Sequence, residues 1–208
     1  MSFFKSLGQN AMLSDVFRHN WEKAGYLIAM AEEICLGQSE LSRSELEVLE
    51  AYCSKLNECD YCYQLHNQAA QVYGAEGELV VALFEDIDTA PTNEKIKALA
   101  HFLKRLTLEP YKNNQTAVNT VLASGCSEKA LADVIYLCSL SAMLNRLVFG
   151  FGIEGGDNQF SQVAQGIKQT GYRKMYENMD WMFLSLKKFS CPNLNRVTPD
   201  DVMQSKDF

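Results

Sequence analysis

The chain has 208 residues, of which 47% are hydrophobic and 22% charged, and its formal net charge is −7. This composition is typical of a globular protein with one sizeable core, and no stretch rich in proline, glycine or serine divides the chain. Nucleic acids and anionic membrane surfaces bind clustered lysine and arginine, so the acidic balance argues against both kinds of partner. We therefore expect one domain over residues 1–208.

The N-terminal stretch "MSFFKSLGQNAMLSDVFRHN" has no uninterrupted apolar core and no clear small-residue cleavage site, so it is a poor secretory signal. The longest apolar run, at 134–144, is shorter than a bilayer span. We therefore expect a cytoplasmic protein that does not enter a membrane. The chain contains seven cysteines without a framework spacing, which predicts mostly free thiols in a reducing compartment. Any disulfide is expected to be catalytic.

Apolar residues recur at helical spacing almost everywhere, and no alternating segment is bounded by hairpin turns. The sequence therefore predicts an all-α fold. A first long helix is expected over about 14–36, ending at Gly37. Ser42 and Glu45 then form a capping box in "SRSE", which opens a helix over about 43–57.

The next helix is expected to start at the cysteine pair and to end near Tyr73. Further apolar patterns with start and stop signals predict helices at about 77–86, 93–107, 111–124, 128–149 and 158–188. The last of these contains Gly166 and Gly171, where it can break.

The segment "ECDYCYQLH" at residues 58–66 carries the residue types that redox chemistry needs. On a helix that starts near Cys59, the side chains of Cys59, Cys62 and His66 fall on one face, a turn apart. A thiol reacts as its thiolate, and the helix N-terminus lowers a thiol pKa while a nearby imidazole can accept the proton. His66 is placed to serve Cys62, although the N-terminal position by itself favours Cys59 as the thiol of lower pKa.

A carboxylate is expected to accompany the imidazole. If the short joint around residue 58 folds two helices into a hairpin, Glu50 lies roughly opposite His66 and Glu47 about one turn further along. Either carboxylate could orient the imidazole and stabilise its charged form.

Two other interpretations of the cluster remain open. The cysteines could be buried small hydrophobes. Alternatively, Cys59, Cys62, His66 and Glu47 could bind zinc, although structural zinc sites usually take their ligands from two separated knuckles. Attachment of a c-type haem is excluded, because Tyr63 instead of histidine follows the second cysteine.

The spacing of Glu47, eleven residues, "CDYC", three residues and His66 resembles the signature of the alkylhydroperoxidase D-like family, within the carboxymuconolactone decarboxylase superfamily. The stretch "LSRSELEVLEAYCSKLNECDYCYQLHNQAAQVYG" is similar to the catalytic segment of its peroxidase-related branch. The later stretches "EKIKALAHFLKRLTLEP" and "ALADVIYLCSLSAMLNRLVFGFGIE" resemble that branch's downstream helices. The resemblance covers about 15–156 and leaves 157–208 as a C-terminal helical extension and tail.

The resemblance implies a helical bundle that assembles as a homo-oligomer, a dimer, trimer or hexamer, and acts in antioxidant defence. It implies that Glu47 and His66 relay a proton from Cys62, which attacks a peroxide or a partner disulfide. Cys59 then resolves the product as the Cys59–Cys62 disulfide. The implied partners are an organic hydroperoxide, a peroxiredoxin, and a dithiol donor of the lipoyl or thioredoxin type. No metal or organic cofactor is expected.

One position departs from the pattern. Some family members have a histidine just before the second cysteine, where this chain has Tyr61. A phenol is a poor base near neutral pH, so we expect Tyr61 only to shape the pocket. Branches that decarboxylate lactones generally lack the cysteine pair, so that activity is not expected. A hypothesis of another class is a binding or regulatory module that senses oxidation through the same cysteines without turnover.

Residues outside the motif receive plainer predictions. His19 and His101 are expected at the surface. Arg146 either pairs with a buried carboxylate or faces the pocket, and we favour the structural role. Cys191, beside Pro192, is the candidate for an adventitious disulfide. The other cysteines are expected to fill the core, with Cys53 near enough in sequence to mispair with the active pair; they are Cys35, Cys53, Cys126 and Cys138.

Overall fold

The computed structural model describes residues 2–8, 10–155 and 157–177, and within them it contains nine α-helices and no β-strand, which confirms the predicted all-α class. The α-helices are α1 (Leu13–His19), α2 (Trp21–Leu36), α3 (Arg43–Leu56), α4 (Asp60–Val72), α5 (Leu79–Glu85), α6 (Glu94–Leu108), α7 (Gln115–Ala123), α8 (Glu128–Phe151) and α9 (Asp157–Glu177). Two short 3-10 helices, η1 (Lys5–Leu7) and η2 (Pro110–Lys112), complete the described elements.

Three of the differences between the predicted and observed helices lie at asparagines. The helix predicted over 14–36 is two helices, because Asn20 has a non-helical backbone that ends α1 and starts α2. The side chain of Asn93 caps α6, and that of Asn114 caps α7. Asparagine favours such positions because its side chain competes with the backbone for helical hydrogen bonds. Residues 178–188, predicted as helix, lie outside the described residues.

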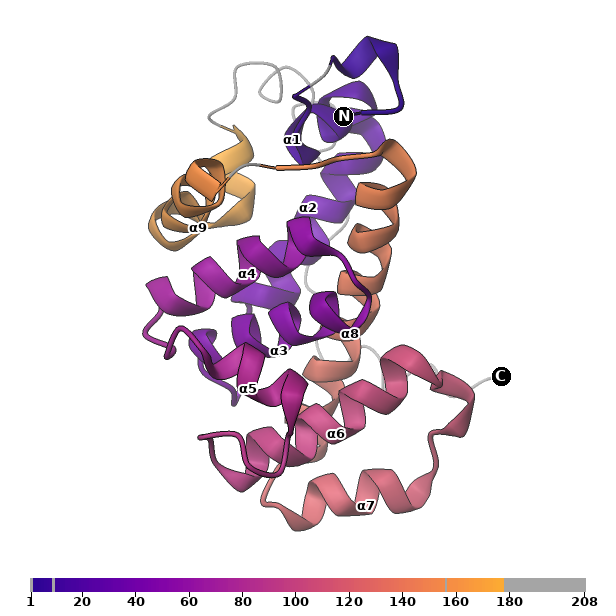
Figure 1. Cartoon of the computed structure of the whole chain (residues 1–208), viewed down its shortest axis with the longest axis vertical. Helices are drawn as coiled ribbons and strands as arrows, with labels where there is room; N and C mark the ends of the chain where they lie inside the picture. Colours follow the sequence, from indigo (N-terminus) through magenta and orange to yellow (C-terminus); the bar gives the residue numbers. More distant parts are fainter. Residues whose placement is uncertain (1, 9, 156, 178–208) are drawn as a thin grey trace, which may run out of the picture.

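Helices α3 and α4 form a hairpin at the centre of the molecule, and the other helices are arranged around it (Figure 1). Helix α8 packs against α3 on one side, while α9 packs against α4 and α2 on the other. Helices α6 and α7 cover the end of the molecule away from the N-terminus. Residues on α3 and α4 are therefore enclosed by other helices from several directions. The candidate site predicted from the sequence lies on these two helices.

The link between α3 and α4 sets the start of α4. The N–H groups of Glu58 and Cys59 donate to the carbonyls of Lys55 and Ser54, at 3.1 and 2.9 Å, which is the Schellman pattern for ending a helix. Glu58 has φ +58°, where glycine is the usual residue. This sharp ending leaves Cys59 as the residue directly before α4.

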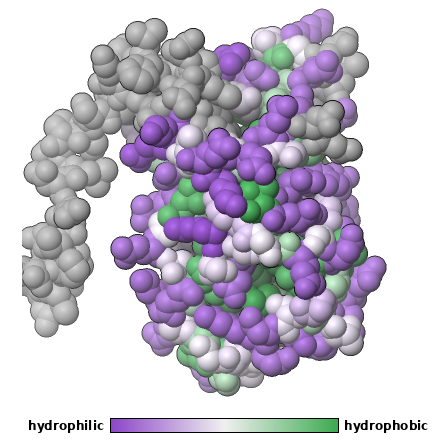
Figure 2. Space-filling view, turned by 90° about the vertical axis from the view of Figure 1, so that its left-hand side faces the viewer, coloured by the Kyte–Doolittle hydropathy of each residue, from purple (hydrophilic) through white to green (hydrophobic). Residues whose placement is uncertain are grey.

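Helix α8 is long and apolar enough, by length and composition, to cross a membrane. In this fold it packs against α2, α3, α4 and α6, and its outer side carries the exposed residues Ile135, Tyr136 and Phe149. The face drawn in Figure 2 is mainly hydrophilic, with hydrophobic patches between polar side chains. Homo-oligomerisation and the absence of a membrane partner both stay predictions.

Replacing Glu58 by glycine is expected to raise the free energy of unfolding by about 0.5–1 kcal/mol, because glycine removes the cost of a left-handed residue. Urea denaturation measures this change. Glu58→Ala is the matched control, since it removes the same charge and keeps the strained backbone. An equal gain from the alanine variant would show that charge, and not backbone strain, determines the effect.

Candidate functional site

The site is built from the middle of α3 and the start of α4. Successive turns of α3 carry Glu47 and Glu50, while Cys59, Cys62 and His66 follow one face of α4 from its N-terminus. All five side chains belong to residues that are at most 5% exposed. The hairpin thus brings the predicted residues into one buried cluster and adds Glu50, the second carboxylate that the hairpin geometry had suggested.

The imidazole of His66 lies between two carboxylates. Its Nδ1 is 2.8 Å from Oε2 of Glu47, and its Nε2 is 3.3 Å from Oε1 of Glu50. Burial alone lowers the pKa of His66, but attraction to Glu50 and the hydrogen bond to Glu47 raise the pKa to about 9. His66 is therefore an imidazolium near neutral pH, with Nδ1–H donating to Glu47 and Nε2 forming an ion pair with Glu50. In this state neither ring nitrogen is free to take a proton from Cys62.

Glu50 links the imidazolium to a third cysteine. Burial raises the pKa of Glu50 to about 7, and Glu47 adds to this although His66 opposes it. The Cys35 thiol, on α2, donates to Oε2 of Glu50 at 3.3 Å. Burial raises the pKa of the Cys35 thiol, and Glu50 and Glu47 raise it further. Cys35, predicted as a core residue, is buried but is also part of the site.

The two cysteines of the motif are coupled through a hydrogen bond. The Cys62 thiol donates to Cys59 and thereby lowers the pKa of Cys59, which the Cys62 backbone N–H and His66 lower further, against the effect of burial. The same hydrogen bond, together with burial, raises the pKa of Cys62 well above its usual value. Of the two thiols, Cys59 at the helix N-terminus is therefore the one that loses its proton more readily.

An open cleft of about 590 Å³ lies on one side of the pair. Cys59, Asp60, Tyr61 and Phe160 are among its lining residues. The Tyr61 hydroxyl accepts a hydrogen bond from the backbone N–H of Leu13 at 3.3 Å, and its ring meets that of Phe160 edge-on. Burial raises the pKa of Tyr61 to about 12, so the phenol stays protonated. This geometry gives Tyr61 a place in the cleft wall.

A smaller cavity of about 40 Å³ borders Cys62. Its polar lining comes from Cys62, His66, Glu50, Cys35 and Tyr172, and the rest of its wall is apolar side chains from α1, α2, α4, α8 and α9. Cys62 and Cys59 thus face different spaces. Sequence reasoning missed Cys35 and Tyr172 because both reach the site through tertiary packing of α2 and α9.

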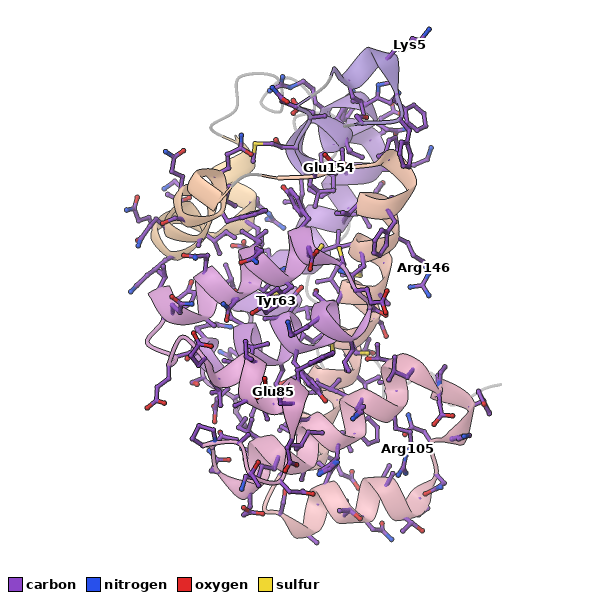
Figure 3. All side chains as sticks on the ribbon, viewed as in Figure 1. Lys5, Tyr63, Glu85, Arg105, Arg146 and Glu154 are labelled. Carbon is purple, nitrogen blue, oxygen red and sulfur yellow. The ribbon has the colours of Figure 1, made fainter. Side chains whose placement is uncertain are left out.

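Asn145 and Arg146, adjacent on α8, have different environments. The buried Asn145 donates to Ser54 Oγ at 3.2 Å and accepts from Asn57 at 2.9 Å, and its hydrogen bond to Cys62 opposes the rise in the Cys62 pKa. Arg146 points out into solvent and donates to the carbonyl of Ala142 at 2.7 Å (Figure 3). The predicted alternatives for Arg146, a buried ion pair or a place in the pocket, are therefore both wrong.

Other residues follow their predictions more closely. Cys53 is buried, as predicted, and pairs with Cys138 through a hydrogen bond, which the Thr107 hydroxyl supports. Cys126 is buried, as predicted. His19 and His101 are exposed, as predicted. Cys191 lies outside the described residues.

Within the described residues, Glu47, Glu50 and His66 are the group that could hold a metal ion, with ligand atoms within 4.8 Å of one another. Neither cysteine belongs to this group, so the predicted set of zinc ligands is not assembled. Oε1 of Glu47 has no hydrogen-bond partner in the described part of the chain. A cation here would have to displace a proton from the His66 imidazolium, because a histidine ligand binds metal through an unprotonated ring nitrogen.

No protein-family model matches the sequence, and no curated protein matches it. Several solved structures are similar to this chain. One, an alkylhydroperoxidase AhpD core described as an uncharacterised peroxidase-related protein from Ralstonia eutropha JMP134, is 16% identical with a TM-score of 0.65, over 72% of this chain and 78% of that one. The chain has the alkylhydroperoxidase fold.

The second structure is an uncharacterised peroxidase-related protein from Silicibacter sp. TM1040, which is 20% identical with a TM-score of 0.66. The match covers 76% of this chain and 82% of that chain. The sequence resemblance to an alkylhydroperoxidase D-like, peroxidase-related protein is therefore confirmed at the level of the fold. At these identities the alkylhydroperoxidase fold does not by itself assign an activity to the site.

The buried imidazolium predicts a pH dependence of stability. The pKa of His66 is raised from 6.5 to about 9, so its stabilising contribution is complete below about pH 6.5 and is lost as the pH rises to about 9. We expect the free energy of unfolding to fall over this range, by at most about 1.4 kcal/mol per pH unit for one proton. Urea denaturation at a series of pH values measures the slope.

His66→Gln should remove this slope, whereas His101→Gln, which deletes an exposed histidine, should keep it. Equal slopes in wild type and His66→Gln would contradict the assignment of the imidazolium to His66.

Proposed function

We propose that the protein is a thiol-dependent peroxidase in which Cys59 and Cys62 alternate between a dithiol and a disulfide, without a metal or organic cofactor. The observation that carries this proposal is the coupled thiol pair at the N-terminus of α4, with a lowered pKa on Cys59 and a buried imidazolium nearby. A pair of inert core cysteines would need neither the lowered pKa nor the charged histidine. The fold shared with peroxidase-related proteins supports the same activity.

The reaction begins with a hydroperoxide next to Cys62. The Cys62 proton passes to Cys59 along their hydrogen bond, and the Cys62 thiolate attacks one peroxide oxygen. The O–O bond breaks as an S–O bond forms, which oxidises Cys62 to a sulfenic acid. The second oxygen leaves as an alkoxide and becomes an alcohol by taking the proton from Cys59.

The Cys59 thiolate then attacks the sulfur of Cys62. An S–S bond forms, and hydroxide leaves and takes a proton from solvent to give water. A dithiol donor of the lipoyl or thioredoxin type then attacks Cys59 from the open cleft, forms a mixed disulfide and leaves as its own disulfide, which restores both thiols. A peroxiredoxin disulfide could take the place of the peroxide as the electron acceptor.

In this scheme the residues around the pair act through charge. Glu47 and Glu50 hold His66 as an imidazolium, and its positive charge lowers the pKa of Cys59. The role of His66 is thus to stabilise a thiolate electrostatically, in place of the direct proton acceptance that the family resemblance implied. We also propose that the protein acts in the cytoplasm and as a homo-oligomer. The exposed apolar residues of α8 support the homo-oligomer, because such residues are commonly buried between subunits.

The purified protein, with excess dihydrolipoamide and a hydroperoxide, is expected to consume the peroxide over many turnovers. Cys62→Ser and Cys59→Ser should each abolish turnover, and His66→Gln should lower its rate by about 10- to 100-fold because the thiolate loses its cation. The matched control is Cys126→Ser, which removes a buried cysteine away from the site and should leave the rate unchanged.

Bound metal is measured on every sample. A single stoichiometric oxidation without turnover would favour a redox sensor, and one bound zinc per chain would favour a metal-binding module. Either result would contradict the proposed peroxidase activity.

A further inference from the structure

Asn145, on α8, is a buried amide whose orientation is fixed by its neighbours. The residue is 2% exposed, and its Oδ1 accepts a hydrogen bond from Nδ2 of Asn57 at 2.9 Å, which turns the Asn145 amide nitrogen to the opposite side. This nitrogen carries two N–H groups. One donates to Oγ of Ser54 at 3.2 Å, and the other is available for the side-chain hydrogen bond that Asn145 makes with Cys62. Both N–H groups and the oxygen of this amide are thus in use.

The serine that accepts from Asn145 is itself held in place. Oγ of Ser54 lies 3.2 Å from Oγ of Ser141, and both serines are at most 1% exposed. Ser54 lies in the last turn of α3 and Asn57 directly follows this helix, whereas Ser141 and Asn145 lie one turn apart on α8. The polar contacts between α3 and α8 therefore hold the amide in position at the start of α4, where Cys62 lies.

The other groups around Cys62 favour its protonated form. The hydrogen bond to Cys59, burial, and the negative charges of Cys59 and Glu50 all raise the pKa of Cys62, whereas the hydrogen bond to Asn145 lowers it. An N–H group has this effect because it donates to a thiolate more strongly than to a neutral thiol. Among these groups, Asn145 is the one that favours the thiolate, which is the form of Cys62 that the proposed reaction requires.

We propose that Asn145 is a catalytic residue whose amide N–H group stabilises the Cys62 thiolate that attacks the peroxide. This inference rests on the proposed thiol chemistry of the pair and adds the group that makes Cys62 the attacking sulfur. When the proton moves from Cys62 to Cys59, the negative charge moves to the Cys62 sulfur, beside a donor that is already oriented. The S–O bond then forms, the O–O bond breaks, and the departing oxygen takes the proton from Cys59.

The test follows one oxidation of Cys62 by hydrogen peroxide, without an electron donor, in the Cys59→Ser background. There the thiol of Cys59 no longer raises the pKa of Cys62, so Cys62 titrates without its partner. Rapid-quench samples and peptide mass spectrometry give the second-order rate of loss of the Cys62 thiol at a series of pH values. Asn145→Leu, which keeps a similar volume without a donor, should raise the midpoint of this profile by about one to two pH units.

The effect on the rate is expected to be smaller than the effect on ionisation. A thiolate of higher pKa is scarcer near neutral pH but is also more nucleophilic, and a Brønsted coefficient of about 0.4–0.5 cancels about half of the change on a logarithmic scale. Asn145→Leu with Cys59 intact should therefore slow the oxidation of Cys62 about 3- to 10-fold near neutral pH.

Ser141→Ala is the matched control. It removes a buried hydroxyl from the same contact between α3 and α8 but leaves Ser54 as the acceptor for Asn145, so both the midpoint and the rate should be unchanged. Asn145→Asp is a second test variant, because its oxygens can accept hydrogen bonds from Asn57 and Ser54 and so keep the network folded. A carboxyl oxygen in place of the N–H group should raise the midpoint at least as much as leucine does.

Three results would overturn the inference: an unchanged midpoint in both Asn145 variants, an equal shift in Ser141→Ala, or slower oxidation without a shift, which would indicate a packing role alone. The outcome is separable from that of the proposed function. A single oxidation that depends on Asn145 without turnover would uphold this role and reject the enzyme, whereas turnover that is indifferent to Asn145 would do the reverse.

Discussion

The structure depends on one buried electrostatic arrangement, the imidazolium of His66 between the carboxylates of Glu47 and Glu50. Isolated charges in a protein core are unfavourable, and each of these three groups is acceptable only because the others are present. The arrangement fixes how α3 and α4 face each other. It also creates a positive charge next to a cysteine at a helix N-terminus, which is the condition under which a buried thiol becomes reactive.

Local sequence signals were enough to predict this part of the fold. The capping box at Ser42, the short joint around residue 58 and the helical spacing from Cys59 to His66 together define a hairpin, and its geometry places both carboxylates near the imidazole. What the sequence alone did not show is that both carboxylates bind at once. The presence of both carboxylates sets the protonation state of His66. With one carboxylate, the second ring nitrogen of His66 would be free to accept a proton.

The remaining parts of the site come from residues without a local signal. Cys35 and Tyr172 belong to helices separated from the motif by about 20 and 100 residues, and nothing in their own segments distinguishes them from core residues. The prediction for Arg146 failed because adjacent residues on a helix point in directions about 100° apart. Asn145 faces the site, so Arg146 points away from it. Prediction from a single sequence succeeds for contacts within a hairpin and fails for contacts made by packing.

The two cysteines of the pair line different spaces, Cys62 a small cavity and Cys59 the larger open cleft. In kinetic terms, an oxidant and a reductant that approach from opposite sides do not compete for one binding position. High concentrations of the electron donor would then leave access for the oxidant unobstructed, and the donor's size would be limited only by the cleft. In the proposed cycle, a Cys59–Cys62 disulfide between these two spaces would let one small redox centre serve two partners of very different bulk.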